Sequence, residues 1–163
     1  MKKLLLALLV TASGCGFQLR GAENVPFRTL YIPGASGGIA LDLKRNIEAG
    51  TDAKVVDSAK QAEAILELSN ERREKIILSL TGSERVREFR LRYSVNFRVH
   101  DAQGREYVPL STVQLARDVT FNDEEILAKE AEKQLLFRDM QADMVQQLLR
   151  RLAAARQPKP AAS

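Results

Sequence analysis

Apolar and polar residues alternate strictly in the middle of the chain, over residues 86–99 (VREFRLRYSVNFRV). The odd positions are occupied by Phe89, Leu91, Tyr93, Val95, Phe97 and Val99. Because successive side chains of a β-strand point to opposite faces, the pattern predicts a strand with one apolar face and one polar, basic face. A further strand is predicted from about residue 106 to residue 119, where Pro109 is typical of an edge strand or a bulge.

Two other segments have the spacing of amphipathic helices. Ile39, Leu43 and Ile47 recur at every fourth position, which predicts a short helix that ends near Gly50. A long helix is predicted from about residue 123 to residue 154. Its apolar stripe consists of Phe137, Met140, Met144, Leu148 and Leu152, widened by Ile126, Leu127, Leu135, Val145 and Leu149.

Short strands are predicted over residues 28–33 and 54–57, on either side of the first helix, and this order is typical of a parallel crossover. Residues 64–68 and 76–80 are also apolar. The polar run 69–75 between them is either a hairpin turn or the solvent-facing stretch of one long bent strand. Two amphipathic helices can cover one face of one sheet, so we expect an α+β two-layer sandwich whose other sheet face is open.

The N-terminus has the layout of an export signal. Lys2 and Lys3 precede the apolar run 4–10, which is too short to span a bilayer. The small residues before Cys15, in the order Ala-Ser-Gly-Cys, are similar to a bacterial lipobox, and Gly16 after it resembles an outer-membrane address. We therefore expect cleavage before Cys15, with S-diacylglycerol and N-acyl groups on that residue. The alternative is an ordinary secretory signal with an incidental cysteine.

These features divide the chain into four parts. Residues 1–14 form the signal peptide, 15–27 a lipidated tether, 28–155 one folded domain and 156–163 a disordered tail. Cys15 is the only cysteine, so no internal disulfide can form and the domain must be stabilised by packing.

Composition argues against most enzyme classes. His100 is the only histidine, which disfavours a catalytic triad or a histidine-based metal site. We expect no enzymatic activity and no cofactor beyond the lipid on Cys15. An envelope hydrolase that uses a pair of carboxylates is the remaining enzymatic alternative. The formal net charge of +4 falls by two when the signal removes Lys2 and Lys3, so charge matters only where it is clustered.

Such a cluster surrounds the alternating strand and consists of Arg85, Arg87, Arg90, Arg92 and Arg98. Arg90 and Arg92 project from the same polar face, about 7 Å apart. The face is either an anion-binding surface or a solvated surface balanced by acidic residues of the neighbouring strands. Nucleic acid is a poor candidate ligand for an exported lipoprotein, whereas lipopolysaccharide is an abundant phosphorylated anion of the outer membrane.

Several segments together resemble the LPS-assembly lipoprotein family, LptE, formerly called rare lipoprotein B. They are GCGFQLRG at 14–21, VREFRLRYSVNFRVHDAQG at 86–104, ARDVTFND at 116–123 and ILAKEAEKQLLFRDM at 126–140. The resemblance implies two helices packed on one face of a mixed four-stranded sheet. It also implies a non-enzymatic subunit of the LPS translocon, bound 1:1 as a plug inside a large β-barrel partner, LptD. Such a subunit assists folding of the barrel, binds lipopolysaccharide and is anchored in the inner, periplasmic leaflet of the outer membrane.

The resemblance also indicates individual basic residues. Leu127-Ala128-Lys129 matches a family segment whose basic residue is linked to LPS binding, so Lys129 is the first candidate. The alternative for Lys129 is a solvated helix lysine paired with a neighbouring glutamate. A second basic residue of the family corresponds to a position near Gly82, which is not basic, and the nearby Arg85 and Arg87 are candidates to replace it. The alternative function is a free-standing outer-membrane lipoprotein that binds an anionic envelope ligand.

Overall fold

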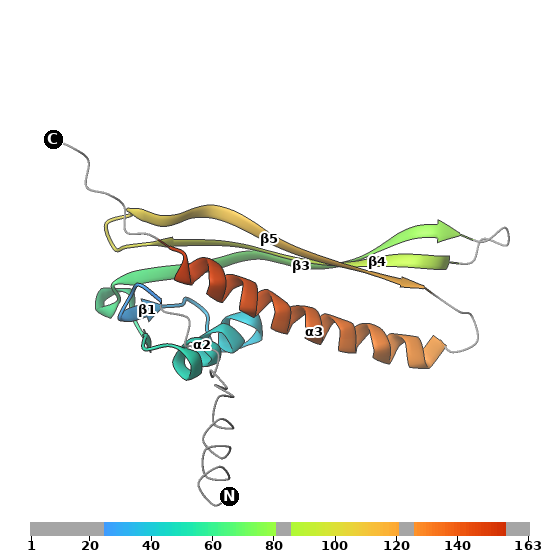
Figure 1. Cartoon of the computed structure of the whole chain (residues 1–163), viewed down its shortest axis with the longest axis horizontal. Helices are drawn as coiled ribbons and strands as arrows, with labels where there is room; N and C mark the ends of the chain where they lie inside the picture. The colour runs from blue at the N-terminus through green and yellow to red at the C-terminus, as the bar shows by residue number, and fades with distance from the viewer. Residues whose placement is uncertain (1–24, 81–85, 121–125, 156–163) are drawn as a thin grey trace, which may run out of the picture.

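Two helices cover one face of a mixed sheet in the computed structural model, which describes residues 25–80, 86–120 and 126–155 (Figure 1). This confirms the predicted α+β two-layer sandwich. The strand order is β2-β1-β3-β4-β5, so the sheet has five strands rather than the expected four. The short strands predicted at 28–33 and 54–57 are both present, as β1, Thr29–Tyr31, and β2, Lys54–Val56, which pair in parallel. The count of four was what the family resemblance implied, and it is one strand too low for this chain.

The helix between β1 and β2 is α2, Gly38–Gly50, and its predicted apolar stripe is confirmed. Ile39, Leu43 and Ile47 are all buried in the core. Gly38 begins the helix with a φ of 57°, in the left-handed region that glycine adopts without a steric penalty. After β2, a short 3₁₀ helix, η2 (Ala59–Gln61), leads into β3, which pairs in parallel with β1.

Three long antiparallel strands form the rest of the sheet: β3 (Ala64–Leu80), β4 (Val86–His100) and β5 (Glu106–Thr120). The alternation predicted for β4 is confirmed, because all its apolar residues from Phe89 to Val99 are buried. The polar residues between them point to the opposite side of the sheet. We call this side the open face, since neither α2 nor α3 covers it in the described part of the chain (Figure 1).

A bulge in β3 inverts the alternation of that strand. Ser69 and Arg72 pair with alternate residues of β4, which leaves Asn70 and Glu71 opposite a single residue. Asn70 has a φ of 51°, a left-handed conformation that asparagine tolerates better than most residues. Odd-numbered residues of β3 face the open side up to Ser69, and even-numbered residues face it from Arg72 to Ile76. A second irregularity after Ile77 then places Ser79 opposite Glu88 on the open side. The polar run 69–75 is therefore part of one long irregular strand, as the second of the two alternatives proposed.

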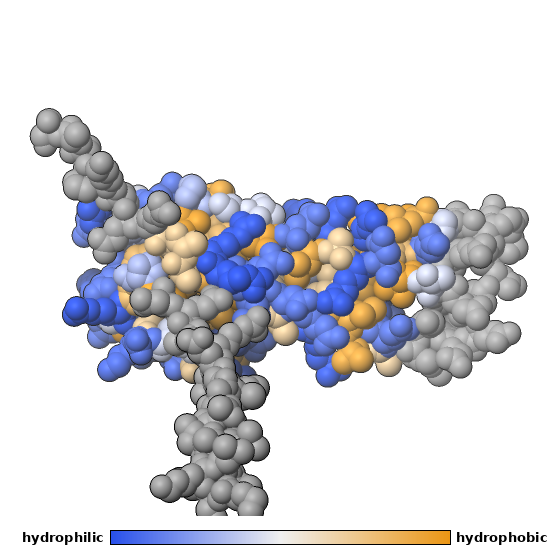
Figure 2. All heavy atoms as spheres, in the orientation of Figure 1, coloured by the Kyte–Doolittle hydropathy of each residue, from blue (hydrophilic) through white to orange (hydrophobic). Residues whose placement is uncertain are grey.

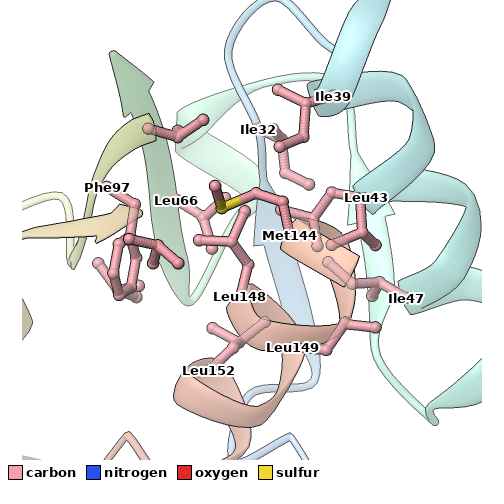
Figure 3. Packing of buried hydrophobic residues seen from close by; sticks show 14 of the residues in the cluster. Ile32, Ile39, Leu43, Ile47, Leu66, Phe97, Met144, Leu148, Leu149 and Leu152 are labelled. Carbon is pink, nitrogen blue, oxygen red and sulfur yellow. The ribbon is translucent and has the colours of Figure 1, made fainter. Parts of the chain in front are cut away.

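The long helix α3, Ile126–Ala153, packs the second half of its length against the sheet and α2. In Figure 3 its side chains point toward Leu43 of α2, Leu66 of β3 and Phe97 of β4. The buried residues of α3 are Met140, Met144, Val145, Leu148, Leu149 and Leu152. Each large aliphatic side chain buried in this way stabilises the fold by about 1.5–3 kcal/mol.

The first half of α3 extends beyond α2, along the far part of the three long strands (Figure 1). Leu135 is 53% exposed, so its predicted place in the apolar stripe is wrong, whereas Phe137 is partly buried. The difference arises because, in the described part of the chain, this half of the helix lies beside the sheet but not beside α2 (Figure 1). The side chains of Ile126 and Leu127 lie outside the described residues.

The core also takes in residues that precede position 28. Val25 and Phe27, at the end of the segment expected to be a tether, are both buried. The ring of Phe27 meets Tyr107 of β5 edge-on, with 4.9 Å between the centroids. The signal segment, Cys15 and the expected tail at 156–163 lie outside the described residues.

Candidate functional site

Arg90 and Arg92 lie on the open face, as predicted, and each has an acidic partner on a neighbouring strand. Arg90 forms two hydrogen bonds with Asp118 of β5, of 2.6 and 2.7 Å. The guanidinium of Arg92 lies 3.4 Å from Glu74 of β3. The hydrogen bond from Arg90 holds the pKa of the Asp118 carboxyl below its usual range, so this pair is ionised at neutral pH.

The same arrangement continues at the other end of β4. Arg98 donates a 2.7 Å hydrogen bond to Glu67 of β3, and this bond lowers the pKa of the Glu67 carboxyl. The imidazole Nε2 of His100 lies 3.2 Å from the same carboxylate. Among the arginines of this face, Arg72 has no bonding partner in the described part of the chain.

The charges of the open face are thus largely balanced within the molecule, which fits the solvated-surface alternative. An anion that bound Arg90 or Arg92 would compete with Asp118 or Glu74 for the same guanidinium donors. The assignment of these two arginines to a lipopolysaccharide site stays a prediction, and their carboxylate partners make them weaker candidates than an unpaired basic group.

A second surface lies at the end of the molecule where β3 passes into β4, which we call the distal end. Leu80 pairs with Val86 across that connection, and Glu88 pairs with Thr120 at the end of β5. The helix α3 begins at Ile126, so the ends of β3 and β5 and the starts of β4 and α3 lie at the same end of the molecule (Figure 1).

Two of the candidate basic residues, Arg87 and Lys129, belong to elements that begin at this distal end. Arg87 is the second residue of β4, and Lys129 belongs to the first turn of α3. Arg85 lies outside the described residues, as do the side chains of Arg87 and Lys129. The fold therefore brings together segments that are about 40 residues apart in sequence, which spacing alone did not predict.

Described side chains beside the distal end are partly apolar. Ile77 is 55% exposed and Leu78 is 43% exposed, both near the end of β3. The ammonium group of Lys75 lies 4.4 Å from the ring centroid of Phe89, a cation–π arrangement. Figure 2 shows hydrophobic residues gathered toward this end of the visible face. A surface with exposed aliphatic groups and nearby cations suits an amphipathic anion better than a fully hydrated one.

A polar network holds the middle of α3 against the sheet and so positions the distal half. Tyr93 donates a 2.8 Å hydrogen bond to Glu71, which also accepts one of 3.1 Å from Arg73. Arg73 in turn bonds Gln141 of α3, whose amide donates to Asp42 of α2 at 2.5 Å. Burial raises the pKa of the Tyr93 hydroxyl. Sequence reasoning missed this network because the bulge, not regular alternation, turns Arg73 toward the helices.

The opposite end of the molecule contains a polar groove of about 580 Å³ between the N-terminal segment, η2 and the β4–β5 turn. Its wall includes Asp101, which is buried and accepts hydrogen bonds from Gln103 and Arg105. These bonds close the hairpin turn, so this carboxylate is engaged structurally. Within the described residues there is no group of three or more metal-ligand residues, and none of their helices is long and apolar enough to cross a membrane.

Comparison with known proteins identifies the family to which this chain belongs. The family model described as "LptE: Lipopolysaccharide-assembly" matches residues 26–152. The LPS-assembly lipoprotein LptE of Photorhabdus laumondii is 29% identical over 151 residues, which cover 90% of this chain and 81% of the relative. The protein of the same name from Pectobacterium atrosepticum is 30% identical over 152 residues, with 90% and 80% of the two chains covered.

Solved structures show the same fold. The solution structure of an uncharacterized lipoprotein B from Nitrosomonas europaea aligns with a TM-score of 0.74 and 45% identity, covering 85% of this chain and 91% of that one. The crystal structure of the rare lipoprotein B from Shewanella oneidensis aligns with a TM-score of 0.66 and 23% identity, covering 77% and 92%. The second likeness concerns the fold alone.

Proposed function

The chain belongs to the LptE family of non-enzymatic LPS-assembly lipoproteins, and from this premise we propose that it is the small subunit of an outer-membrane lipopolysaccharide translocon. It would sit 1:1 as a plug inside a large β-barrel partner, LptD, assist assembly of that barrel and bind lipopolysaccharide. The observation that carries the proposal is the family match over residues 26–152, which includes every strand of the described fold, α2, η2 and all of α3 except its last residue.

The open face supports a location inside a barrel. The lumen of outer-membrane barrels is polar and wet. A sheet face on which most charges are already paired with one another, as Arg90 is with Asp118, can be placed in such a lumen with those ions still paired. The distal end, with exposed aliphatic side chains and nearby cations, supports lipopolysaccharide as the ligand, because the lipid part of that molecule carries both phosphates and acyl chains.

A detergent pull-down of the tagged, lipidated chain from outer membranes tests the plug. We expect a stoichiometric, protease-resistant complex with one large β-barrel protein. Recovery of the chain as a free monomer from native membranes would refute this proposal. It would favour the alternative function, an independent lipoprotein that binds an anionic envelope ligand.

We assign anchoring to Cys15, modified with S-diacylglycerol and N-acyl groups and inserted in the inner, periplasmic leaflet of the outer membrane. The assignment is supported by the lipobox-like Ala-Ser-Gly-Cys order before the mature chain. Labelled palmitate is expected to enter the natural chain and not the Cys15→Ser variant. Equal labelling of both would show that the lipid is attached elsewhere.

We further propose that Lys129, Arg85 and Arg87 contact the phosphates of lipopolysaccharide at the distal end. Replacing both arginines with glutamate, or Lys129 with glutamate, is expected to weaken lipopolysaccharide binding several-fold because a cation is exchanged for an anion. Lys60→Glu is the matched control, since Lys60 is exposed and lines the groove at the opposite end. Unchanged binding in the double variant would remove Arg85 and Arg87 from the site.

A further inference from the structure

One edge of the sheet has no neighbouring strand in the described part of the chain. β5 is the outermost of the described strands, is 15 residues long and pairs there only with β4. In an antiparallel strand with one neighbour, every second residue turns its N–H and C=O groups outward. Among the described residues, no backbone-to-backbone hydrogen bond from outside the sheet reaches β5. These outward groups are consequently available for pairing.

The edge also lacks the devices that usually prevent pairing. Natural proteins protect exposed edges with proline, lysine, bulges or a covering segment. Pro109 and the irregular register occur only near the first end of β5. From Ser111 to Thr120 the register with β4 is regular and the sequence contains no proline, glycine or lysine. Its charged residues, Arg117 and Asp118, are both engaged with side chains of this chain.

Charge beside the edge favours a basic occupant. Asp143 of α3 bonds Arg117 and is 55% exposed. Asp139, one helical turn earlier on α3, is exposed and has no bonding partner among the described residues. Asp118 flanks the edge on the open side and is also 55% exposed. Near Arg117 the flank therefore carries one exposed carboxylate, that of Asp139, which no arginine neutralises among the described residues.

The two sides of the edge differ in polarity. Toward α3, Leu115 and Val119 are partly buried against the core. On the open face, Thr112 and Gln114 are exposed. A strand added here would meet apolar neighbours on one side and polar neighbours on the other, so its own residues should alternate in the same way.

We propose that residues 111–120 of β5 accept an extended strand of a partner polypeptide by sheet addition. The strand has alternating apolar and polar residues and places a basic side chain beside Asp139. A second copy of this chain is disfavoured, because pairing two β5 edges about an axis normal to the sheet puts both α3 helices on one side. The flanks that carry Asp139 and Asp143 would then face each other, and like charges repel.

Amide hydrogen exchange on the full, lipidated chain tests the proposal, in native outer-membrane vesicles and in detergent micelles that contain the chain free of every other protein. We expect every second amide between Ser111 and Thr120 to exchange at least tenfold more slowly in the membranes. The amides of β2, at the other edge, should not change. Equal rates in both samples, or slowing of all β5 amides by one factor, would overturn the proposal.

Two further measurements, the dependence of protection on concentration and the recovery of a barrel protein, distinguish a partner strand from a second copy and strand addition from the translocon plug. Alternate protection that appears in micelles as the concentration rises, together with a doubled mass, would replace the partner strand with a second copy and overturn the proposal. The inference does not depend on which partner supplies the strand. Protection of every second β5 amide, without recovery of a barrel protein in the pull-down, would therefore refute the translocon plug and support strand addition at β5. A barrel complex without this protection would support the plug and refute strand addition.

A charge variant gives an independent test in the same vesicles. Asp139→Lys should reduce the protection of the β5 amides at least threefold, because it repels the basic side chain of the strand. Glu48→Lys is the control, since Glu48 is an exposed carboxylate on α2 without a bonding partner among the described residues. Equal protection in Asp139→Lys and Glu48→Lys would show that the partner strand places no basic side chain beside Asp139, and would overturn that part of the proposal.

Discussion

Replacing Asn70 with valine perturbs the bulge that sets the phase of β3. Asn70 has a φ of 51°, and the extra residue it contributes turns Arg73 toward the helices rather than toward the open face. There the Arg73 guanidinium lies 4.9 Å from the Tyr93 ring centroid and bonds Gln141. The conformation of one residue thus determines the contacts of several others.

The expected loss of stability follows from the left-handed backbone conformation of residue 70. A side chain with a Cβ in the left-handed region costs about 1–2 kcal/mol, and a β-branched side chain has the least freedom to relieve it. Asn70→Val should therefore lower the free energy of unfolding by about 1–2 kcal/mol. Asn70→Gly should lose less than about 1 kcal/mol, because glycine adopts the conformation freely and only increases the freedom of the unfolded chain.

Urea unfolding followed by circular dichroism measures this difference, on chains that lack residues 1–14 and carry Cys15→Ser. Deletion of Asn70 provides a third variant, since it removes the extra residue and would turn Arg73 to the open face. The deletion should be less stable than Asn70→Val. If Asn70→Val were as stable as Asn70→Gly, the left-handed bulge would not be required for the fold.

Three further predictions concern the core and the paired charges. Tyr93→Phe removes the 2.8 Å hydrogen bond to Glu71 and should cost about 1–2 kcal/mol at pH 7. Burial raises the pKa of Tyr93, so the folded chain should lose stability as the pH rises above about 10, and thermal melting should show a smaller alkaline loss in the variant. Leu148→Ala, in the core, should cost about 2–5 kcal/mol in urea unfolding, whereas Leu135→Ala at an exposed site should change stability by less than about 0.5 kcal/mol; similar losses would contradict the packing. The lowered pKa of Glu67 stabilises the fold above about pH 4.3, and this contribution is lost as the pH falls. In Arg98→Gln the urea midpoint should therefore change less with pH between about pH 3 and 5. An unchanged pH profile would show that the pair contributes nothing to stability.

The elements with regular patterns were predictable from the sequence. The alternation in β4 and the fourfold spacing in α2 identified both elements and their buried faces, because local periodicity depends only on the geometry of a strand or a helix. The bulge at Asn70 was not predictable from period two, since the apolar residues before and after it belong to opposite phases. For the same reason the polar run 69–75 was open to two interpretations.

By itself the sequence determined which residues are apolar and at what period, and hence the two-layer α+β sandwich. It also contains the motifs that resemble the LptE family and the lipobox-like segment at Cys15. Only the tertiary structure decided that Arg90 pairs with Asp118, that the starts of β4 and α3 share one end, and that no other described strand pairs with the outer edge of β5. These properties depend on the order and register in which distant segments pair, and no local pattern along the chain specifies them.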